Sequence, residues 1–277
     1  MSTGDESEPR CLWEPRVTAD GSPTLENTAL AQTCHSMDGA WSESVERYAR
    51  ACRIAETARR EGVVRILDIG TGLALNIAAA LAELDDELGV GNATLSVATF
   101  ELDSRVLEEA ALLASSAAPE AETGAQRPSF RASWRVALET ISRAREGDGQ
   151  PVGWSDGRSG ELRLMLGDAR VTLPRLDPDL AFDAIFLDPF SPASDPPLWE
   201  PGFLMHVAHR VASRGVLSTY TASLAVRAAL FAAGLEVGKG PRFGQKGEGT
   251  LAGRDIELEG FEERRQRKIA RRAAKLV

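Results

Sequence analysis

Short apolar runs alternate with stretches of helical periodicity along most of the chain. The runs lie at 63–70, 95–103, 161–168, 182–188 and 215–221. Apolar residues recur every three or four positions in the stretches between or after them, which predicts helices. These helices are expected at 73–88, 104–115, 199–212 and 222–233. Continuous apolar runs are typical of parallel strands, because helices cover both faces of such a sheet.

The last two runs, 235–240 and 249–255, follow each other without a helical stretch between them. They therefore predict an antiparallel hairpin at the end of the sheet. Five strand–helix units and this hairpin predict an α/β fold. Its doubly wound, mostly parallel sheet has seven strands in a Rossmann-like arrangement.

Four segments are expected along the chain. Residues 1–14 are polar and acidic and are expected to be disordered, and 15–60 form an N-terminal, substrate-side segment that includes a helix over 38–60. Residues 61–256 form the main domain. Within it, the insert 117–160 is long, is low in complexity and contains a helix over 130–145. A basic tail, 257–277, ends the chain.

Composition narrows the class of protein. The 277 residues are 43% hydrophobic and 26% charged, which is ordinary for a globular protein. The chain has no apolar run long enough to span a membrane and no secretory signal, and its three cysteines form no CxxC pair. We therefore expect a cytoplasmic protein without a metal site.

The net charge of −9 disfavours nucleic-acid binding by the molecule as a whole. The charge is uneven, however. Residues 261–277 carry seven Lys or Arg against two Glu, which is +5 and leaves −14 for the remainder. This segment is either a solvated helix or a phosphate-binding tail.

A glycine loop follows the first predicted strand. Gly70 and Gly72 can adopt backbone angles that other residues avoid, and they let a ligand approach the main chain. The third glycine of a dinucleotide fingerprint is absent, so a compact zwitterion such as the methionine part of S-adenosyl-L-methionine fits better than a pyrophosphate. Asp68 could bind its ammonium group. The alternative is that the loop is a tight turn.

Acidic residues follow the next two predicted strands. Glu101 comes after the second strand, where it could accept hydrogen bonds from ribose hydroxyls. Asp168, followed by Ala169, comes after the third, where it could accept a hydrogen bond from the adenine amino group. Each acid could instead cap a helix. Their repetition at successive strand ends favours a cofactor site.

The fourth predicted strand ends in Asp188, which opens the proline-rich loop 188–197. Prolines make this loop rigid. The loop resembles the D/N/S-P-P-F/Y loop of amine-methylating enzymes, and this resemblance implies that Asp188 accepts a hydrogen bond from a substrate amine. A free alkyl amine has a pKa of about 10, so Asp188 could also take up its proton. Phe190 could pack against the developing cation. The alternative is that Asp188 only caps the turn.

The segment 183–199 resembles the signature of the methyltransferase domain of the MnmC family and of its stand-alone form, MnmD. The similarity extends to the loop 68–76 with Asn76, to 20–25 and 35–40 with His35, and to 243–249 with Lys246. It covers roughly residues 15–256. Ala74 departs from the family's pattern, since it stands where the family's last loop glycine is expected.

This resemblance implies a class I methyltransferase that uses S-adenosyl-L-methionine and methylates the 5-aminomethyl group of the wobble uridine in tRNA. Asp188 would be the catalytic carboxylate, and Glu101 and Asp168 would hold the cofactor. His35 would lie on the substrate side, and Lys246 would meet a phosphate or pair with a surface acid. No second dinucleotide fingerprint is present, so the family's flavin domain and FAD are not expected.

Two other functions remain open. The chain could be a small-molecule amine methyltransferase or an aminopropyltransferase-like enzyme, or it could be a non-catalytic homologue. A tRNA enzyme is expected to present a basic surface around Asp188, formed by Arg242, Lys246 and the tail. A small-molecule enzyme is expected to cover the site with a lid, for which the helix over 130–145 is the candidate.

Overall fold

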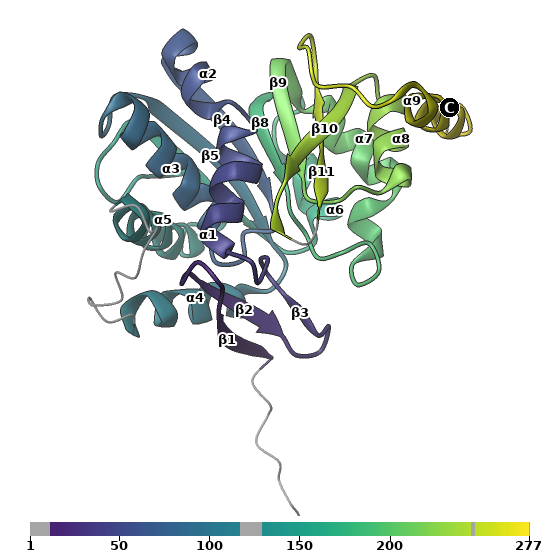
Figure 1. Ribbon diagram of the computed structural model, residues 1–277. Helices are drawn as coiled ribbons and strands as arrows, with labels where there is room; N and C mark the ends of the chain where they lie inside the picture. The colour runs from purple at the N-terminus through teal and green to yellow at the C-terminus, as the bar shows by residue number, and fades with distance from the viewer. Residues whose placement is uncertain (1–11, 117–128, 245–246, 277) are drawn as a thin grey trace, which may run out of the picture.

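The computed structural model describes residues 12–116, 129–244 and 247–276, so Lys246 and the first eleven residues lie outside the described chain. Its centre is an eight-stranded sheet with the strand order β10-β11-β9-β8-β4-β5-β7-β6 (Figure 1). Five of these strands run parallel to one another: β4 (Val63–Ile69), β5 (Thr94–Glu101), β7 (Gly160–Leu166), β8 (Phe182–Leu187) and β9 (Val211–Thr219). The predicted α/β fold with a mostly parallel sheet is confirmed.

The terminal hairpin is also as predicted. Strands β10 (Glu236–Arg242) and β11 (Glu248–Gly253) pair antiparallel, and β11 joins the sheet antiparallel to β9. The eighth strand, β6 (Val152–Gly153), was not predicted. It comes from the insert and pairs antiparallel with β7. Its two residues are too few to produce a recognisable hydrophobic pattern.

Helices cover both faces of the sheet and create two cores. One core is formed with α3 (Leu75–Leu88) and α5 (Ser129–Arg145), and the other with α7 (Pro201–His209) and α8 (Leu224–Ala232). Successive residues of a strand face opposite cores, as Ile66 and Leu67 of β4 do. This two-sided burial explains the continuous apolar runs.

The helix predicted over 199–212 is shorter than expected. A 3₁₀ turn over Pro196–Trp199 (η3) precedes α7, which ends at His209, and β9 begins at Val211. Val211 pairs with Phe182 of β8, so sheet pairing overrides the helical periodicity at this point. Across the described residues, every helix is too short or too polar to span a membrane.

The N-terminal segment forms a small antiparallel sheet of β1 (Trp13–Val17), β2 (Pro23–Asn27) and β3 (Gln32–Thr33). Trp13 and Glu14 therefore lie in a strand, which corrects the expectation of disorder at these two positions. These strands are short, and Trp13 and Leu25 are the hydrophobic residues that they bury in the core, so the sequence did not reveal them.

The helix predicted over 38–60 is divided into three parts. They are α1 (Ala40–Glu43), the π-helical segment η1 (Ser44–Arg50) and α2 (Ile54–Glu61). Arg53 adopts a left-handed conformation with φ 55° and separates η1 from α2. The hydrophobic period alone does not distinguish a π-helical segment from an α-helix.

Two helices follow strands β5 and β7. They are α4 (Ser104–Ser116), which packs into the same core as α3, and α6 (Ala169–Thr172), which continues into a 3₁₀ turn over Leu173–Arg175 (η2). Both begin at the carboxyl ends of their strands. They therefore frame the edge of the sheet at which ligands bind in such folds.

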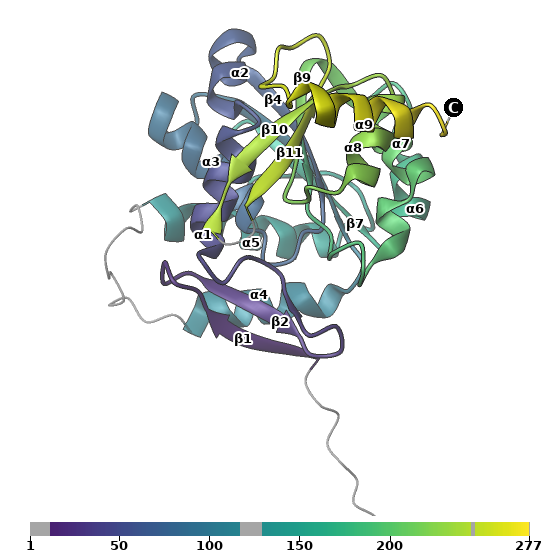
Figure 2. The same cartoon turned by 45° about the vertical axis from the view of Figure 1, so that its right-hand side comes forward.

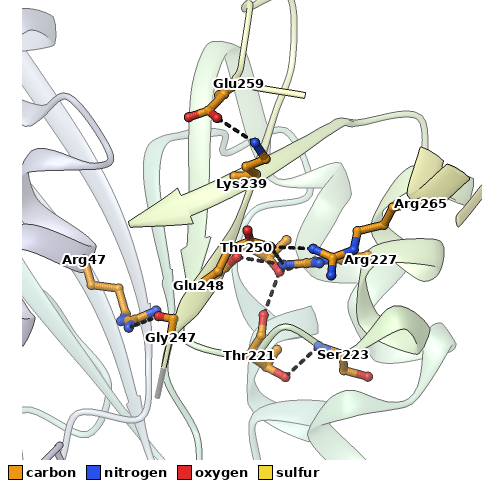
Figure 3. Close-up of polar contacts among 11 residues, drawn as sticks. Arg47, Thr221, Ser223, Arg227, Lys239, Gly247, Glu248, Thr250, Glu259 and Arg265 are labelled. Atoms are coloured by element: carbon orange, nitrogen blue, oxygen red, sulfur yellow. Dashed lines mark hydrogen bonds and ion pairs between the residues drawn. The ribbon is translucent and has the colours of Figure 1, made fainter. Parts of the chain in front are cut away.

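The basic C-terminal segment forms the helix α9 (Glu263–Ala273), which packs against α8. Arg227 of α8 donates to Thr250 Oγ1 and to Glu248 Oε1, both over 2.9 Å, and Glu248 also pairs with Arg265 of α9 at 3.0 Å (Figure 3). Phe261 lies beneath the Arg227 guanidinium, 4.3 Å from it. Helix α9 lies at the opposite end of the molecule from β1–β3 (Figures 1 and 2).

Candidate functional site

A cavity of about 940 Å³ lies at the carboxyl ends of the parallel strands. Its wall includes Gly70 and Gly72 after β4, Glu101 at the end of β5, Asp168 after β7 and Asp188 after β8. The small sheet β1–β3 supplies a further part of the wall. Strand order reverses between β4 and β8, so the cavity lies at the switch point where α/β sheets bind ligands.

The glycine loop passes very close to β8. Gly70 has φ +96°, and a Cβ atom at this position would lie 2.7 Å from the carbonyl oxygen of Asp188. The amides of Gly70 and Thr71 both donate to the carbonyl of Phe100, at 3.0 and 3.1 Å. The loop is thus fixed against β5 and β8, and glycine is required where it meets Asp188.

Glu101 is held on the cavity wall by two main-chain amides. Its Oε2 accepts from the amide of Gly72, and its Oε1 accepts from the amide of Asp103, both over 2.9 Å. Burial raises the pKa of this carboxyl group, although the two amides oppose the shift. Each oxygen retains a lone pair that a ligand hydroxyl could use.

Asp168 both lines the cavity and caps α6. It accepts a hydrogen bond from the amide of Arg170 at 2.9 Å, and it pairs with the Arg170 guanidinium at 2.6 Å. The Arg170 side chain lowers the pKa of this carboxyl group. Ala169 is buried against the cavity next to it. Asp168 therefore caps a helix, as the alternative interpretation expected, and it also lines the cavity.

Asp68 is fully buried beneath the glycine loop and is not part of the cavity wall. Its Oδ2 accepts from Thr99 Oγ1 at 2.7 Å, and burial raises its pKa well above the ordinary value. This buried position does not match the expectation that Asp68 binds the ammonium group of a ligand. An acid just inside the strand end points into the core, because side chains alternate along the strand.

Asp188 directly follows β8 and lines the cavity. Tyr48 Oη donates to its Oδ1 at 2.5 Å, and Asn76 Nδ2 donates to its Oδ2 at 2.9 Å. Asn76 was expected among the cofactor ligands, but the structure places it behind Asp188 and away from the cavity wall. Tyr48 was missed, because nothing in the sequence links two positions 140 residues apart.

The proline-rich loop is fixed at several points. Phe190 stacks on Trp13 of β1, with ring centroids 6.1 Å apart and an interplanar angle of 20°. Tyr220 Oη donates to the carbonyl of Pro189 at 2.9 Å, and Gln32 Nε2 donates to Ser191 Oγ at 2.8 Å. Trp13 and Gln32 show that the N-terminal sheet packs directly on this loop.

His35 is buried at the inner edge of the N-terminal sheet and lines the cavity. Its Nδ1 lies 3.3 Å from Thr24 Oγ1, and its amide donates to the same oxygen. Helix α5 does not form the lid proposed for it. It packs along α3, where Trp134 Nε1 donates to the carbonyl of Leu73 at 2.7 Å. The part of the chain that adjoins the cavity instead is β1–β3.

The cavity wall is acidic. Among the described residues of the wall, the two arginines, Arg16 and Arg170, are each paired with a carboxylate of the same wall. The carboxylates are Glu26, Glu101, Asp103, Asp168, Asp188 and Asp195. Such a wall favours a cationic ligand and disfavours a phosphate. Within the described residues, no cluster of His, Cys, Asp and Glu is arranged to hold a metal ion.

Comparison with known proteins identifies relatives of this chain. A family model described as S-adenosyl-L-methionine-dependent methyltransferase matches residues 150–255. The tRNA 5-methylaminomethyl-2-thiouridine biosynthesis bifunctional protein MnmC of Ralstonia nicotianae is 31% identical over 243 residues, which is 87% of this chain and 34% of that protein. Its counterpart in Azoarcus sp. is 31% identical over 82% of this chain and 33% of that protein.

The structure of MNMC2 from Aquifex aeolicus is similar to this one, with a TM-score of 0.74 and 29% sequence identity. The match covers 96% of this chain and 77% of that chain. The chain spans about a third of the length of the bifunctional relatives. The structural similarity therefore extends over nearly all of the chain.

Proposed function

Because the chain is an S-adenosyl-L-methionine-dependent methyltransferase related to the methyltransferase domain of MnmC, we propose that it methylates the 5-aminomethyl group of the wobble uridine in tRNA. The observation that carries the proposal is the placement of Asp188. Asp188 and Phe190 both line an acidic cavity at the strand ends. This combination suits a primary amine, which is a cation at neutral pH.

The cavity also fits the cofactor. S-adenosyl-L-methionine, when bound, supplies a methyl group on a positively charged sulfur. The loop at Gly70 and Gly72 would accept its methionine part, Glu101 its ribose hydroxyls, and Asp168 with Ala169 its adenine. Carboxylates around the cavity would favour the two positive charges of the molecule.

Asp188 would accept a hydrogen bond from the substrate amine and take up its excess proton. A free amine of this kind is protonated at neutral pH, and its nitrogen lone pair is available only after that proton has left. Phe190 would present its ring face to the cation that forms on nitrogen. Rigid anchoring of the loop 188–197 would contribute by positioning these groups.

Phosphate groups of tRNA would have to be bound outside the acidic cavity. Helix α9 offers several exposed cations that form no ion pair with other described residues. They are Arg264, Lys268, Arg271 and Arg272, and Lys275 follows just after the helix. We propose that they bind the backbone of tRNA, with the anticodon loop at the cavity and another part of the molecule at α9. A tRNA substrate also implies a cytoplasmic setting.

The test is incubation with methyl-labelled S-adenosyl-L-methionine and undermodified total tRNA, followed by nucleoside analysis. The proposal predicts label in a 5-methylaminomethyl uridine nucleoside. Label in another nucleoside, or none, would refute it. Small primary amines form a second arm of the experiment, because the acidic and partly covered cavity also suits a small-molecule amine methyltransferase.

A further inference from the structure

We propose that Tyr48 is a positioning residue that, together with Asn76, holds the Asp188 carboxylate in one orientation towards the cavity. This inference rests on the proposed function, in which Asp188 meets the substrate amine. Tyr48 Oη and Asn76 Nδ2 donate to different oxygens of the carboxylate, at 2.5 and 2.9 Å. The two donors approach from different elements, η1 and α3, so they prevent rotation of the carboxylate.

The backbone around Tyr48 is itself fixed. Ser218 Oγ of β9 donates to the carbonyl of Arg47 at 2.5 Å, which ties η1 to the sheet. The Tyr48 ring is fully buried and meets Phe186 of β8 edge to face, with centroids 5.5 Å apart. Segments of π-helix are rare and often occur at functional sites. This one brings the buried hydroxyl of Tyr48 to Asp188, the residue that follows β8.

Tyr48 can act as a donor over the whole working pH range. Burial raises its pKa well above the ordinary value, and the negative charge of Asp188 raises it further. Each donor uses one lone pair of the Asp188 oxygen that it meets, and each oxygen of a carboxylate has two. The carboxylate therefore keeps its accepting capacity while losing its freedom to rotate.

Several titratable groups face Asp188 from the surrounding elements. They are Cys34 after β3, Tyr48 of η1, Asp68 of β4 and Tyr220 after β9. Burial raises the pKa of each of these groups. The two tyrosines and the cysteine therefore remain uncharged near neutral pH. Tyr48 is the tyrosine that donates to the carboxylate, whereas Tyr220 donates to a neighbouring carbonyl.

The first test measures the carboxylate without any cofactor or tRNA. Protein labelled with ¹³Cγ-aspartate is titrated by NMR, and the Asp188 signal is identified by its absence from Asp188→Asn. In Tyr48→Phe, the midpoint of Asp188 protonation should lie about one pH unit higher than in the unsubstituted protein, because a donor to the charged form has been removed. Tyr220→Phe is the matched control and should leave the midpoint in place. An unchanged midpoint in Tyr48→Phe would overturn the proposal.

The second test uses turnover with tRNA. Tyr48→Phe should lower kcat by about 10- to 100-fold, the range expected for one hydrogen bond to a charged group, and change the KM for S-adenosyl-L-methionine by less than about twofold. Equal losses in kcat and cofactor affinity would indicate a general structural role and overturn the proposal. Should Tyr48→Phe fail to fold, Asn76→Ala should give the same two results through Oδ2. Failure of the unsubstituted protein to methylate tRNA would refute the proposed function, while the NMR titration would still decide the role of Tyr48.

Discussion

The amide of Gly72 donates to Glu101 Oε2 over 2.9 Å, which joins the glycine loop of β4 to the acid at the end of β5. Glu101 accepts a second amide, from Asp103, through its other oxygen. One carboxylate thus fixes the loop and the following turn relative to each other. It also faces the part of the cavity in which we place the cofactor ribose.

Glu101→Gln should weaken cofactor binding by about tenfold or more. A side-chain amide can accept at only one of its two ends, so one of the two main-chain amides loses its partner, and the charge on the wall is also lost. Calorimetric titration with S-adenosyl-L-homocysteine measures the effect. Glu26→Gln is the matched control, since Glu26 lines the cavity from β2, and we expect little change in its cofactor affinity. Equal losses in both variants would argue against the role of Glu101.

Asp188→Asn should reduce turnover by about 100-fold or more while cofactor affinity stays within about twofold, because an amide cannot take up a proton at neutral pH. Initial rates with tRNA and calorimetric titration separate the two quantities. Asp195→Asn serves for comparison, since Asp195 is another carboxylate of the cavity wall, and we expect it to remain active. Loss of cofactor binding in Asp188→Asn would instead make Asp188 a cofactor ligand.

Patterns that extend over several residues predicted the fold well. The apolar runs became β4, β5, β7, β8 and β9, because burial on both faces of a parallel sheet marks every residue of the strand. The expected acids Glu101, Asp168 and Asp188 lie on one cavity, because the carboxyl ends of parallel strands share one edge.

Contacts between distant segments could not be predicted in the same way. In the sequence, Tyr48 is one of the apolar positions of a predicted helix. Only tertiary packing brings its hydroxyl to Asp188. Asp68 resembles the other strand-end acids in sequence but points into the core. The N-terminal sheet was missed because its strands bury few hydrophobic side chains, so the covering of the cavity was assigned to the wrong segment.

Ala74 occupies a strained position at the start of α3, with φ 58°. Left-handed backbone costs alanine about 1–2 kcal/mol, whereas glycine adopts it freely. Ala74→Gly should therefore destabilise the protein by at least about 1 kcal/mol less than Ala78→Gly, which places glycine at an equally buried position inside the same helix. Urea unfolding of both variants gives the comparison. Equal losses would show that strain at Ala74 contributes nothing measurable.

Exposed cations of α9 should contribute to tRNA affinity through phosphate contacts. Replacing Arg264, Lys268 and Arg271 by glutamine should weaken binding and reduce the slope of log K against log salt by roughly one unit for each lost contact. Filter binding at several salt concentrations measures both effects. Arg59→Gln is the control, because Arg59 is already paired with Glu87 at the surface. An unchanged salt slope in the triple variant would indicate that α9 has only a structural role, in which it packs through the buried residues Ile269 and Ala273.

Asp68 should make stability fall as pH rises. Burial raises the pKa of Asp68 in the folded protein, whereas in the unfolded chain it has its ordinary value near 4. Between these two values the folded protein binds more protons than the unfolded chain, so the free energy of unfolding decreases with increasing pH across this window. Asp68→Asn removes this contribution, and its stability should decline less steeply from about pH 4 upwards.

Urea unfolding at a series of pH values measures that difference, and Asp168→Asn provides a control of opposite sign. Arg170 lowers the pKa of Asp168, so the stabilisation from this pair is present above the unfolded value and is lost as pH falls through the folded one. Asp168→Asn should therefore lower the free energy of unfolding near neutral pH, and the loss should be smaller in acid. Parallel stability curves for the unsubstituted protein and Asp68→Asn would show that the buried carboxyl group has no raised pKa.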